Sequence, residues 1–190
     1  MKTDRYKAIV MGGSAGSMEA LLRIFSGLPN NFKLPVIIVC HVHPLDDGGL
    51  VEFFCLQTRL NIKEADDKEP IRPGWLYFPP ANYHLLVEQD ETFSLTIDPK
   101  VNYARPSIDV LFESAAFVYG EQLIGILLTG ANHDGAKGIS VIKKRGGHTI
   151  VQNPDSAQCP VMPQAAIDTG DVDTILSIQQ ITHFIRSEVA

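Results

Sequence analysis

Short apolar runs alternate along the chain with longer segments of helical spacing. Tyr6–Met11, Val36–His41 and Leu123–Leu128 are continuous apolar runs of strand length, which are typical of parallel strands buried on both faces. Ser17–Leu28 places its large apolar side chains on one helical face and is followed by a proline. We also predict a strand at Thr149–Val151 and helices at Leu50–Arg59, Ser107–Tyr119, Gly135–Arg145, Pro163–Thr169 and Ile178–Val189. This alternation predicts an α/β fold, a three-layer α/β/α sandwich on a doubly wound, mostly parallel sheet.

The middle of the chain has a different pattern. Pro73 and Gly74 are a turn signal, and three short apolar segments follow at close spacing: Trp75–Phe78, Tyr83–Val87 and Phe93–Ile97. The polar residues 89–91 between the last two segments indicate a hairpin loop. We therefore expect a small antiparallel hairpin excursion inside the α/β chain.

Composition and charge narrow the class of protein. The chain has 190 residues, of which 45% are hydrophobic and 20% charged, so we expect a single domain that folds without disulfides or metals. The 16 basic and 22 acidic residues give a net charge of −6, which argues against a nucleic-acid binder. No apolar stretch reaches the roughly 18 residues of a membrane helix, and the N-terminus lacks the features of a secretion signal. Since the three cysteines have neither disulfide nor metal-site spacing, we expect free thiols in the cytoplasm.

Candidate chemistry gathers at the ends of the predicted strands. Ser14 follows the first strand, His41 ends the second, and Asp134 follows the third apolar run. Open α/β sheets bind ligands beyond the carboxyl ends of their strands, so we expect these side chains at one sheet edge. A serine, a histidine and an aspartate are the side chains of a serine hydrolase triad.

The residues around Ser14 support a nucleophile. Gly12, Ser14 and Gly16 have the G-x-S-x-G spacing of a strand–turn–helix elbow, which exposes the serine hydroxyl. The N–H groups at the start of the following helix would lie where an oxyanion forms. The alternative is a glycine-rich turn that binds phosphate or only reverses the chain, although the spacing matches neither dinucleotide-binding loops nor P-loops.

Nearby histidines leave a metal site open as a second interpretation. His41 and His43 would share one face of a strand, and Asp46 and Asp47 follow closely. With His84, they would provide the ligands of a metallohydrolase. The common H-x-H-x-D-H arrangement is missed by one position, and its closing histidine is absent.

Three other residues have structural interpretations. Asp134 is also a good N-cap for the helix predicted at Gly135–Arg145. Asp109 is interpreted as an acid in the first turn of its own helix. Cys40 precedes His41 on the same strand, so its side chain points to the opposite face, and we expect it in the core.

The motifs taken together resemble the catalytic domain of chemotaxis protein-glutamate methylesterases, the CheB family. The resemblance runs nearly end to end, from the Ser14 loop and the His41 strand end to four further motifs. These motifs are PPANYH at 79–84, RPSIDVLF at 105–112, LTGANHDGA at 128–136 and MPQAA at 162–166. In the family, the residues at the positions of Ser14, His41 and Asp134 form the triad.

Several positions depart from the family pattern. Ala15 stands where threonine is usual, and Ala131 and Asn132 replace a Met-Gly pair. One additional residue separates His41 from Pro44, so His43 is an alternative base. Val161 replaces the glycine before Met162.

The resemblance implies a cytoplasmic serine hydrolase that demethylates glutamate γ-methyl esters on chemoreceptor helices, and some family members also deamidate receptor glutamine. Ser14 would be the nucleophile, His41 the base and Asp134 the residue that orients His41. Backbone N–H groups near Ala15 and Ala131 would bind the oxyanion, while Arg105 and Met162 would line the cleft. No metal or organic cofactor is needed, and we expect no membrane insertion.

The resemblance also implies a single methylesterase catalytic domain over residues 1–190, without the receiver domain that precedes it in the usual family protein. Ala15 and Ala131 leave open a degenerate, catalytically weak module that binds receptors or partners.

Overall fold

Seven strands form one parallel sheet in the order β3-β4-β2-β1-β7-β8-β9. The computed structural model describes residues 5–41 and 48–189. The sheet contains β1 (Ala8–Gly13), β2 (Val36–Cys40), β3 (Asn61–Glu64), β4 (Trp75–Phe78), β7 (Leu123–Leu127), β8 (His148–Gln152) and β9 (Thr174–Leu176).

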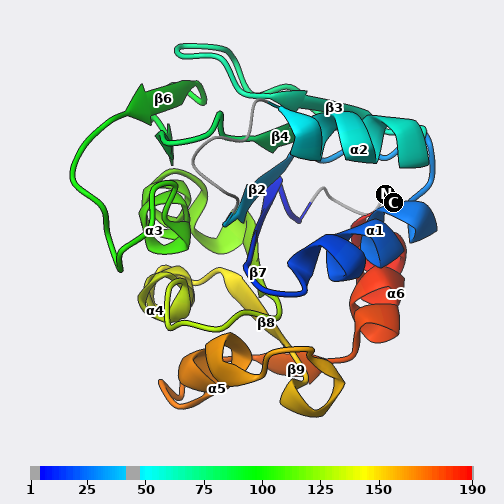
Figure 1. The fold of residues 1–190 in the computed structure, drawn as a ribbon, viewed down its shortest axis with the longest axis vertical. Coiled ribbons are helices and arrows are strands. Elements are labelled where there is room, and N and C mark those ends of the chain that lie inside the picture. The colour runs from blue at the N-terminus through cyan, green and yellow to red at the C-terminus, as the bar shows by residue number, and fades with distance from the viewer. Residues whose placement is uncertain (1–4, 42–47, 190) are drawn as a thin grey trace.

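Helices cover both faces of this sheet (Figure 1). One face packs against α1 (Ser17–Gly27), α2 (Gly49–Gln57) and α6 (Ile178–Val189). The other packs against α3 (Ile108–Tyr119), α4 (Ala136–Lys144) and α5 (Val161–Ile167). The predicted three-layer α/β/α sandwich is therefore confirmed, and each predicted helix ends within two residues of an observed one.

The apolar runs form buried strands because both of their faces have a partner layer. In β1, Ile9 and Met11 pack into one core, while Ala8 and Val10 pack into the other. All six residues of this strand are buried. Alternation within an uninterrupted apolar run therefore fills two cores at once.

The antiparallel hairpin is smaller than the sequence predicts. It consists of β5 (His84–Val87) and β6 (Phe93–Thr96), which form a separate two-stranded sheet and pack against α3. The segment Trp75–Phe78, which we expected in the same excursion, is instead β4 of the main sheet and pairs in parallel with β2 and β3. Its aromatic residues fit a buried parallel strand equally well, so local pattern does not identify its partner.

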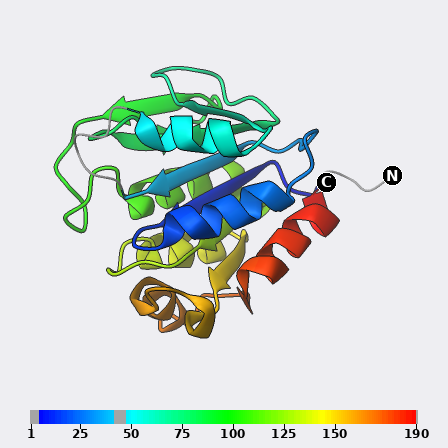
Figure 2. The same cartoon turned by 45° about the vertical axis from the view of Figure 1, so that its right-hand side comes forward.

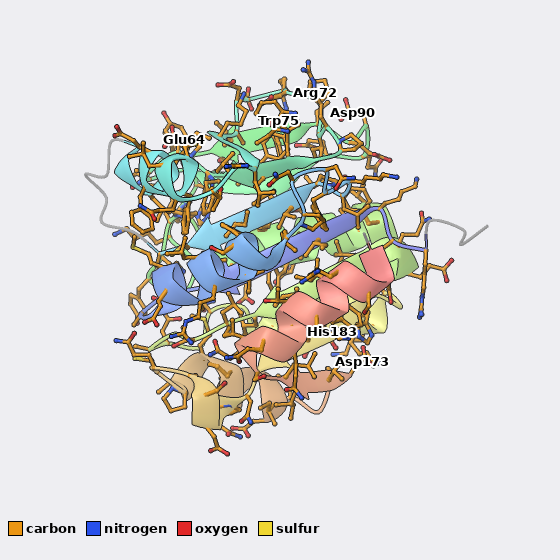
Figure 3. All side chains as sticks on the ribbon, turned by 90° about the vertical axis from the view of Figure 1, so that its right-hand side faces the viewer. Glu64, Arg72, Trp75, Asp90, Asp173 and His183 are labelled. Carbon is orange, nitrogen blue, oxygen red and sulfur yellow. The ribbon has the colours of Figure 1, made fainter. Side chains whose placement is uncertain are left out.

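The sequence did not predict β3 and β9. These strands form the two edges of the sheet, and their residues are mostly half-buried or exposed, so neither has the apolar run of a central strand. In Figure 3, Glu64 and Trp75 mark the β3–β4 side of the molecule, and Asp173 and His183 mark the side of β9 and α6.

The chain reverses its direction of winding at the centre of the sheet. From β1 it proceeds to β2 on one side, whereas β7 lies on the other. The helices that follow β1 and β7, α1 and α4, pack on opposite faces. This is a topological switch point, and open α/β sheets bind their ligands beyond the strand ends at such a point. In Figure 2, β2 points toward the side of the molecule to which the loop between β6 and α3 extends.

No helix within the described ranges combines the length and apolar character needed to span a bilayer.

Candidate active site

The loop that follows β1 presents Ser14 at the switch point. The Ser14 N–H donates to the Thr129 carbonyl (2.9 Å), and the Ser17 N–H and hydroxyl donate to the Ser14 carbonyl (2.9 and 2.6 Å). Gly16 has a φ of 81°, and a Cβ there would lie 2.5 Å from the Gln158 Oε1, so the turn requires glycine. The backbone of Ser14 is thus fixed from both sides, while its side chain remains half-buried.

Thr129 joins this loop to the one that follows β7. Its buried hydroxyl donates to the Ala15 carbonyl (2.9 Å) and accepts from the Cys159 N–H (2.9 Å). Thr129 itself belongs to the loop that leads to Asp134. Its hydrogen bond to Ala15 therefore sets the spacing between the serine loop and the Asp134 loop.

His41 and Asp134 form a direct pair at the same edge. The His41 Nε2 lies 2.9 Å from the Asp134 Oδ2, across 93 residues of sequence. The His41 side chain is 14% exposed, whereas that of Asp134 is fully buried. An ionised carboxylate accepts and does not donate, so Nε2 carries the proton and Nδ1 is left as the basic nitrogen.

The side chain of Asp134 reaches the N-terminus of α3. Its carboxylate accepts from the Ser107 hydroxyl (2.8 Å) and from the N–H groups of Ile108 (2.7 Å) and Asp109 (3.2 Å). The Asn102 amide adds a donor at 2.9 Å. Burial alone would raise the pKa of Asp134, but the hydrogen bonds from His41, Asn102, Ile108 and Ser107 lower it below its ordinary value. Asp134 is therefore anionic and positioned to stabilise a charged His41.

One structural interpretation of this region needs a correction. Asp134 does not cap the helix that follows it, since the N-cap of α4 is Gly135. Ser107 is the N-cap residue of α3, and its hydroxyl donates to Asp134 and accepts no cap hydrogen bond. Asp109 lies in the first turn of α3, as expected, and also accepts from the N–H groups of Gly135 (3.0 Å) and Gly138 (2.7 Å) at the start of α4.

Two exposed alanines lie at the rim of the site. Ala15 and Ala131 belong to the loops after β1 and β7, and their N–H groups donate to none of the described acceptors. Backbone N–H groups of this kind stabilise an oxyanion.

Arg105 and Met162 have structural contacts. The Arg105 guanidinium donates to the carbonyls of Ile97 (2.7 Å) and Asp98 (3.0 Å) and to the Asn82 side chain, so it fixes the loop between β6 and α3. Met162 is fully buried and packs against Gly130, where a Cβ would meet its Cε at 2.5 Å. Met162 therefore supports the loop from beneath, contrary to the expectation that it lines the cleft.

Those residues of the metal interpretation that the structure describes do not form a metal site. His84 is buried; its Nδ1 accepts from the Ser107 N–H (3.1 Å) and its Nε2 lies 3.2 Å from the Pro99 carbonyl. Both ring nitrogens are thus engaged. His43, Asp46 and Asp47 lie outside the described residues. Within the described part of the chain, no three His, Cys, Asp or Glu side chains are arranged to hold a metal ion.

Cys40 is 3% exposed and lies in the core, as predicted. Burial raises the pKa of its thiol, partly offset by its hydrogen bond with Ser17 (2.9 Å).

Two asparagines were missed by sequence reasoning. The Asn102 amide bridges Asp109 (2.7 Å) and Asp134 (2.9 Å), and the Asn132 Nδ2 lies 3.3 Å from the His41 Nδ1. Asn102 precedes Tyr103 in a turn where both residues have positive φ, a conformation in which asparagine is common without any functional reason. For Asn132, the only signal was its departure from the family pattern.

Comparisons with known proteins agree with this architecture. The model of the CheB methylesterase family matches residues 9–185. A relative from Leptospira interrogans, named "Putative protein-glutamate methylesterase/protein-glutamine glutaminase", is 47% identical over 95% of this chain and 94% of its own length. A protein-glutamate methylesterase/protein-glutamine glutaminase from Anaeromyxobacter dehalogenans is 35% identical over 97% of this chain, which spans 54% of that relative.

A solved structure gives the same result. The crystal structure of the Thermotoga maritima CheB methylesterase catalytic domain superposes with a TM-score of 0.89 at 31% identity, covering 94% of this chain and 96% of that one. The chain therefore belongs to the CheB methylesterase family.

Proposed function

We propose that this chain is a cytoplasmic protein-glutamate methylesterase that hydrolyses glutamate γ-methyl esters on chemoreceptor helices, with Ser14, His41 and Asp134 as its triad. The family membership and the names of its relatives support the activity. The observation that carries the residue assignment is the 2.9 Å pair between His41 and Asp134, at the strand ends that also hold the Ser14 loop.

In the first half of the reaction, the Ser14 Oγ attacks the ester carbonyl while its proton passes to the His41 Nδ1. Asp134 keeps Nε2 protonated and stabilises the imidazolium that forms. The N–H groups of Ala15 and Ala131 bind the oxyanion. His41 then returns the proton to the departing methoxide, so methanol leaves and an acyl-enzyme remains.

In the second half, a water molecule attacks the acyl-enzyme and gives a proton to His41, which passes it to the Ser14 Oγ as the bond between that oxygen and the acyl group breaks. The products are the receptor glutamate and free Ser14. The same steps, with ammonia as the leaving group, would convert a receptor glutamine to glutamate. The names of the relatives support this second activity.

We further propose that residues 1–190 form a single methylesterase catalytic domain. The near-complete mutual coverage with a solved CheB catalytic domain supports this.

The test compares the native protein with Ser14→Ala and with Ser26→Ala. Ser26 is an exposed serine of α1 outside the site and provides the matched control. We expect Ser14→Ala to lower methanol release from methylated receptor by about 10⁴- to 10⁶-fold with little change in melting temperature. Ser26→Ala should resemble the native protein in both measurements.

A fluorophosphonate that reacts with activated serines provides an independent readout. We expect it to label Ser14, identified by peptide mass spectrometry, and to leave Ser14→Ala unlabelled. A native protein that binds receptor but neither releases methanol nor reacts with the probe would be the degenerate binding module instead. Ester hydrolysis that survives Ser14→Ala would point to another nucleophile or to metal chemistry.

A further inference from the structure

Asn132 contacts the proposed catalytic base directly. Its Nδ2 lies 3.3 Å from the His41 Nδ1, and its Oδ1 accepts from the Asp134 N–H (3.0 Å). The second contact sets the orientation of the carboxamide, because a carbonyl oxygen is the only end that accepts a hydrogen bond. The NH₂ group therefore faces His41.

This contact falls on the nitrogen that the reaction needs. The His41 Nε2 donates to Asp134, so Nδ1 holds the lone pair that must take the Ser14 proton. A ring nitrogen has a single lone pair in the ring plane, so the Asn132 amide and the Ser14 hydroxyl compete for it. No hydrogen bond joins the Ser14 hydroxyl to a side chain within residues 5–41 and 48–189, whereas that from Asn132 is formed.

Resting on the function proposed above, we propose that Asn132 is a positioning residue that holds His41 in its resting state and slows proton transfer from Ser14. When Nδ1 takes the proton, an N–H of His41 faces the NH₂ group of Asn132. The two donors cannot bond, and the amide can turn its oxygen toward His41 only by giving up the Asp134 N–H.

The contact with Asn132 is thus stronger in the ground state than in the transition state. An interaction of that kind raises the barrier. Its loss should accelerate the first step by roughly three- to tenfold, the equivalent of one ordinary neutral hydrogen bond.

The experiment removes the amide in two ways, with Asn132→Ala and Asn132→Gly. His133→Ala is the matched control, because His133 is the exposed neighbour in the same loop and its one hydrogen bond among the described residues is that of its backbone carbonyl with the Ala136 N–H. Four quantities are measured for each protein: the second-order rate of Ser14 labelling by a fluorophosphonate, kcat and KM for methylated receptor, and the ¹⁵N resonance of the His41 Nδ1.

We expect both Asn132 variants to label and turn over about three- to tenfold faster, with KM unchanged. The Nδ1 resonance should shift in both, because it loses a hydrogen bond, and stay in place in His133→Ala. A purely structural role for Asn132 would lower the melting temperature without raising either rate.

Equal or slower labelling in folded Asn132 variants would overturn the inference, and slower labelling would show that the amide assists the reaction. If the native protein is labelled at Ser14 and the variants react at the same rate, the inference alone fails. If neither native protein nor variant is labelled or active, the proposed function fails with it.

Discussion

Asp109 and Asp134 are two buried carboxylates that lie at the start of each other's helices. Asp134 precedes α4 but accepts from the first N–H groups of α3, while Asp109 belongs to α3 and accepts from the first N–H groups around α4. The amide of Asn102 donates to both. The pair thus fastens α3 and α4 together directly beneath the site.

Their pKa values nevertheless shift in opposite directions. Burial raises the pKa of Asp109, and the nearby negative charge of Asp134 adds to the effect, so the hydrogen bonds that Asp109 accepts do not compensate. Burial acts on Asp134 in the same sense, but the donors around it, with His41 first, lower its pKa. The direction of each pKa shift depends on how many hydrogen-bond donors the carboxylate has and on whether one of those donors can carry a positive charge.

Under the proposed triad, this difference separates a structural carboxylate, Asp109, from the acid that holds the base, Asp134. A triad acid must remain ionised while it holds a histidine, and Asp134 is the one held in that form. Asp109 makes no hydrogen bond to His41 among the described contacts. Substitutions at the two sites should therefore affect different measurements.

The largest effect is expected from Asp134→Asn. The amide is isosteric, but its NH₂ group faces donors and no longer keeps the His41 Nε2 protonated, so the base takes the wrong tautomer. We expect kcat to fall about 10⁴-fold. Turnover of methylated receptor checks this, with folding verified by circular dichroism. A loss below about 100-fold would mean that Asp134 is not the triad acid.

Asp109→Asn is the matched substitution at the structural carboxylate. One oxygen can still accept from the start of α4, but the new NH₂ group faces the Asn102 amide. We expect the free energy of unfolding to fall by about 1–3 kcal/mol, the range for a buried donor left without a partner. Activity at a temperature where the variant is folded should fall less than tenfold. Urea denaturation and kcat distinguish the outcomes, and a kcat loss equal to that of Asp134→Asn would abolish the distinction between the two sites.

The bridge between the carboxylates can be removed with Asn102→Gly. Glycine accepts the positive φ of this position (50°), so the backbone is preserved. Asn102 is exposed, and water can replace its amide, so we expect a loss of only about 1 kcal/mol. Tyr103→Gly is the control, because Tyr103 also has positive φ and is 97% exposed. Similar losses of unfolding free energy in both variants would assign the effect to the turn and not to the bridge.

The strands and the site residues differ in how well the sequence predicts them. The central strands were predicted because long apolar runs need burial on both faces, and the strand-end rule then placed Ser14, His41 and Asp134 at one edge. The edge strand β3, with the sequence NIKE, has no such run. Its pairing with β4 depends on partners elsewhere in the chain.

The contacts of Asn102 and Asn132 could not be predicted from the sequence for a similar reason. Asn102 and Asp134 are 32 residues apart, and Asn132 and His41 are 91 apart. Asparagine in a turn is explained locally by its backbone preferences. Only the fold shows that one amide bridges two carboxylates and that another faces the base.

The smallest expected effect concerns how the unfolding free energy lost in Asp134→Asn and in Asp109→Asn depends on pH. The two dependences should have opposite signs. The Asp134 pKa is lowered on folding, so its contribution to stability is present above the unfolded value of about 3.9 and is lost as pH falls through the folded one. The Asp109 pKa is raised, so its contribution is full below about pH 3.9 and is lost as pH rises through the folded value. Relative to the native protein, Asp134→Asn should lose most unfolding free energy near neutral pH, and Asp109→Asn should lose most in acid. Urea denaturation at a series of pH values from about 2 to 7 measures both differences, and slopes of the same sign would contradict the opposite shifts assigned to the two carboxylates.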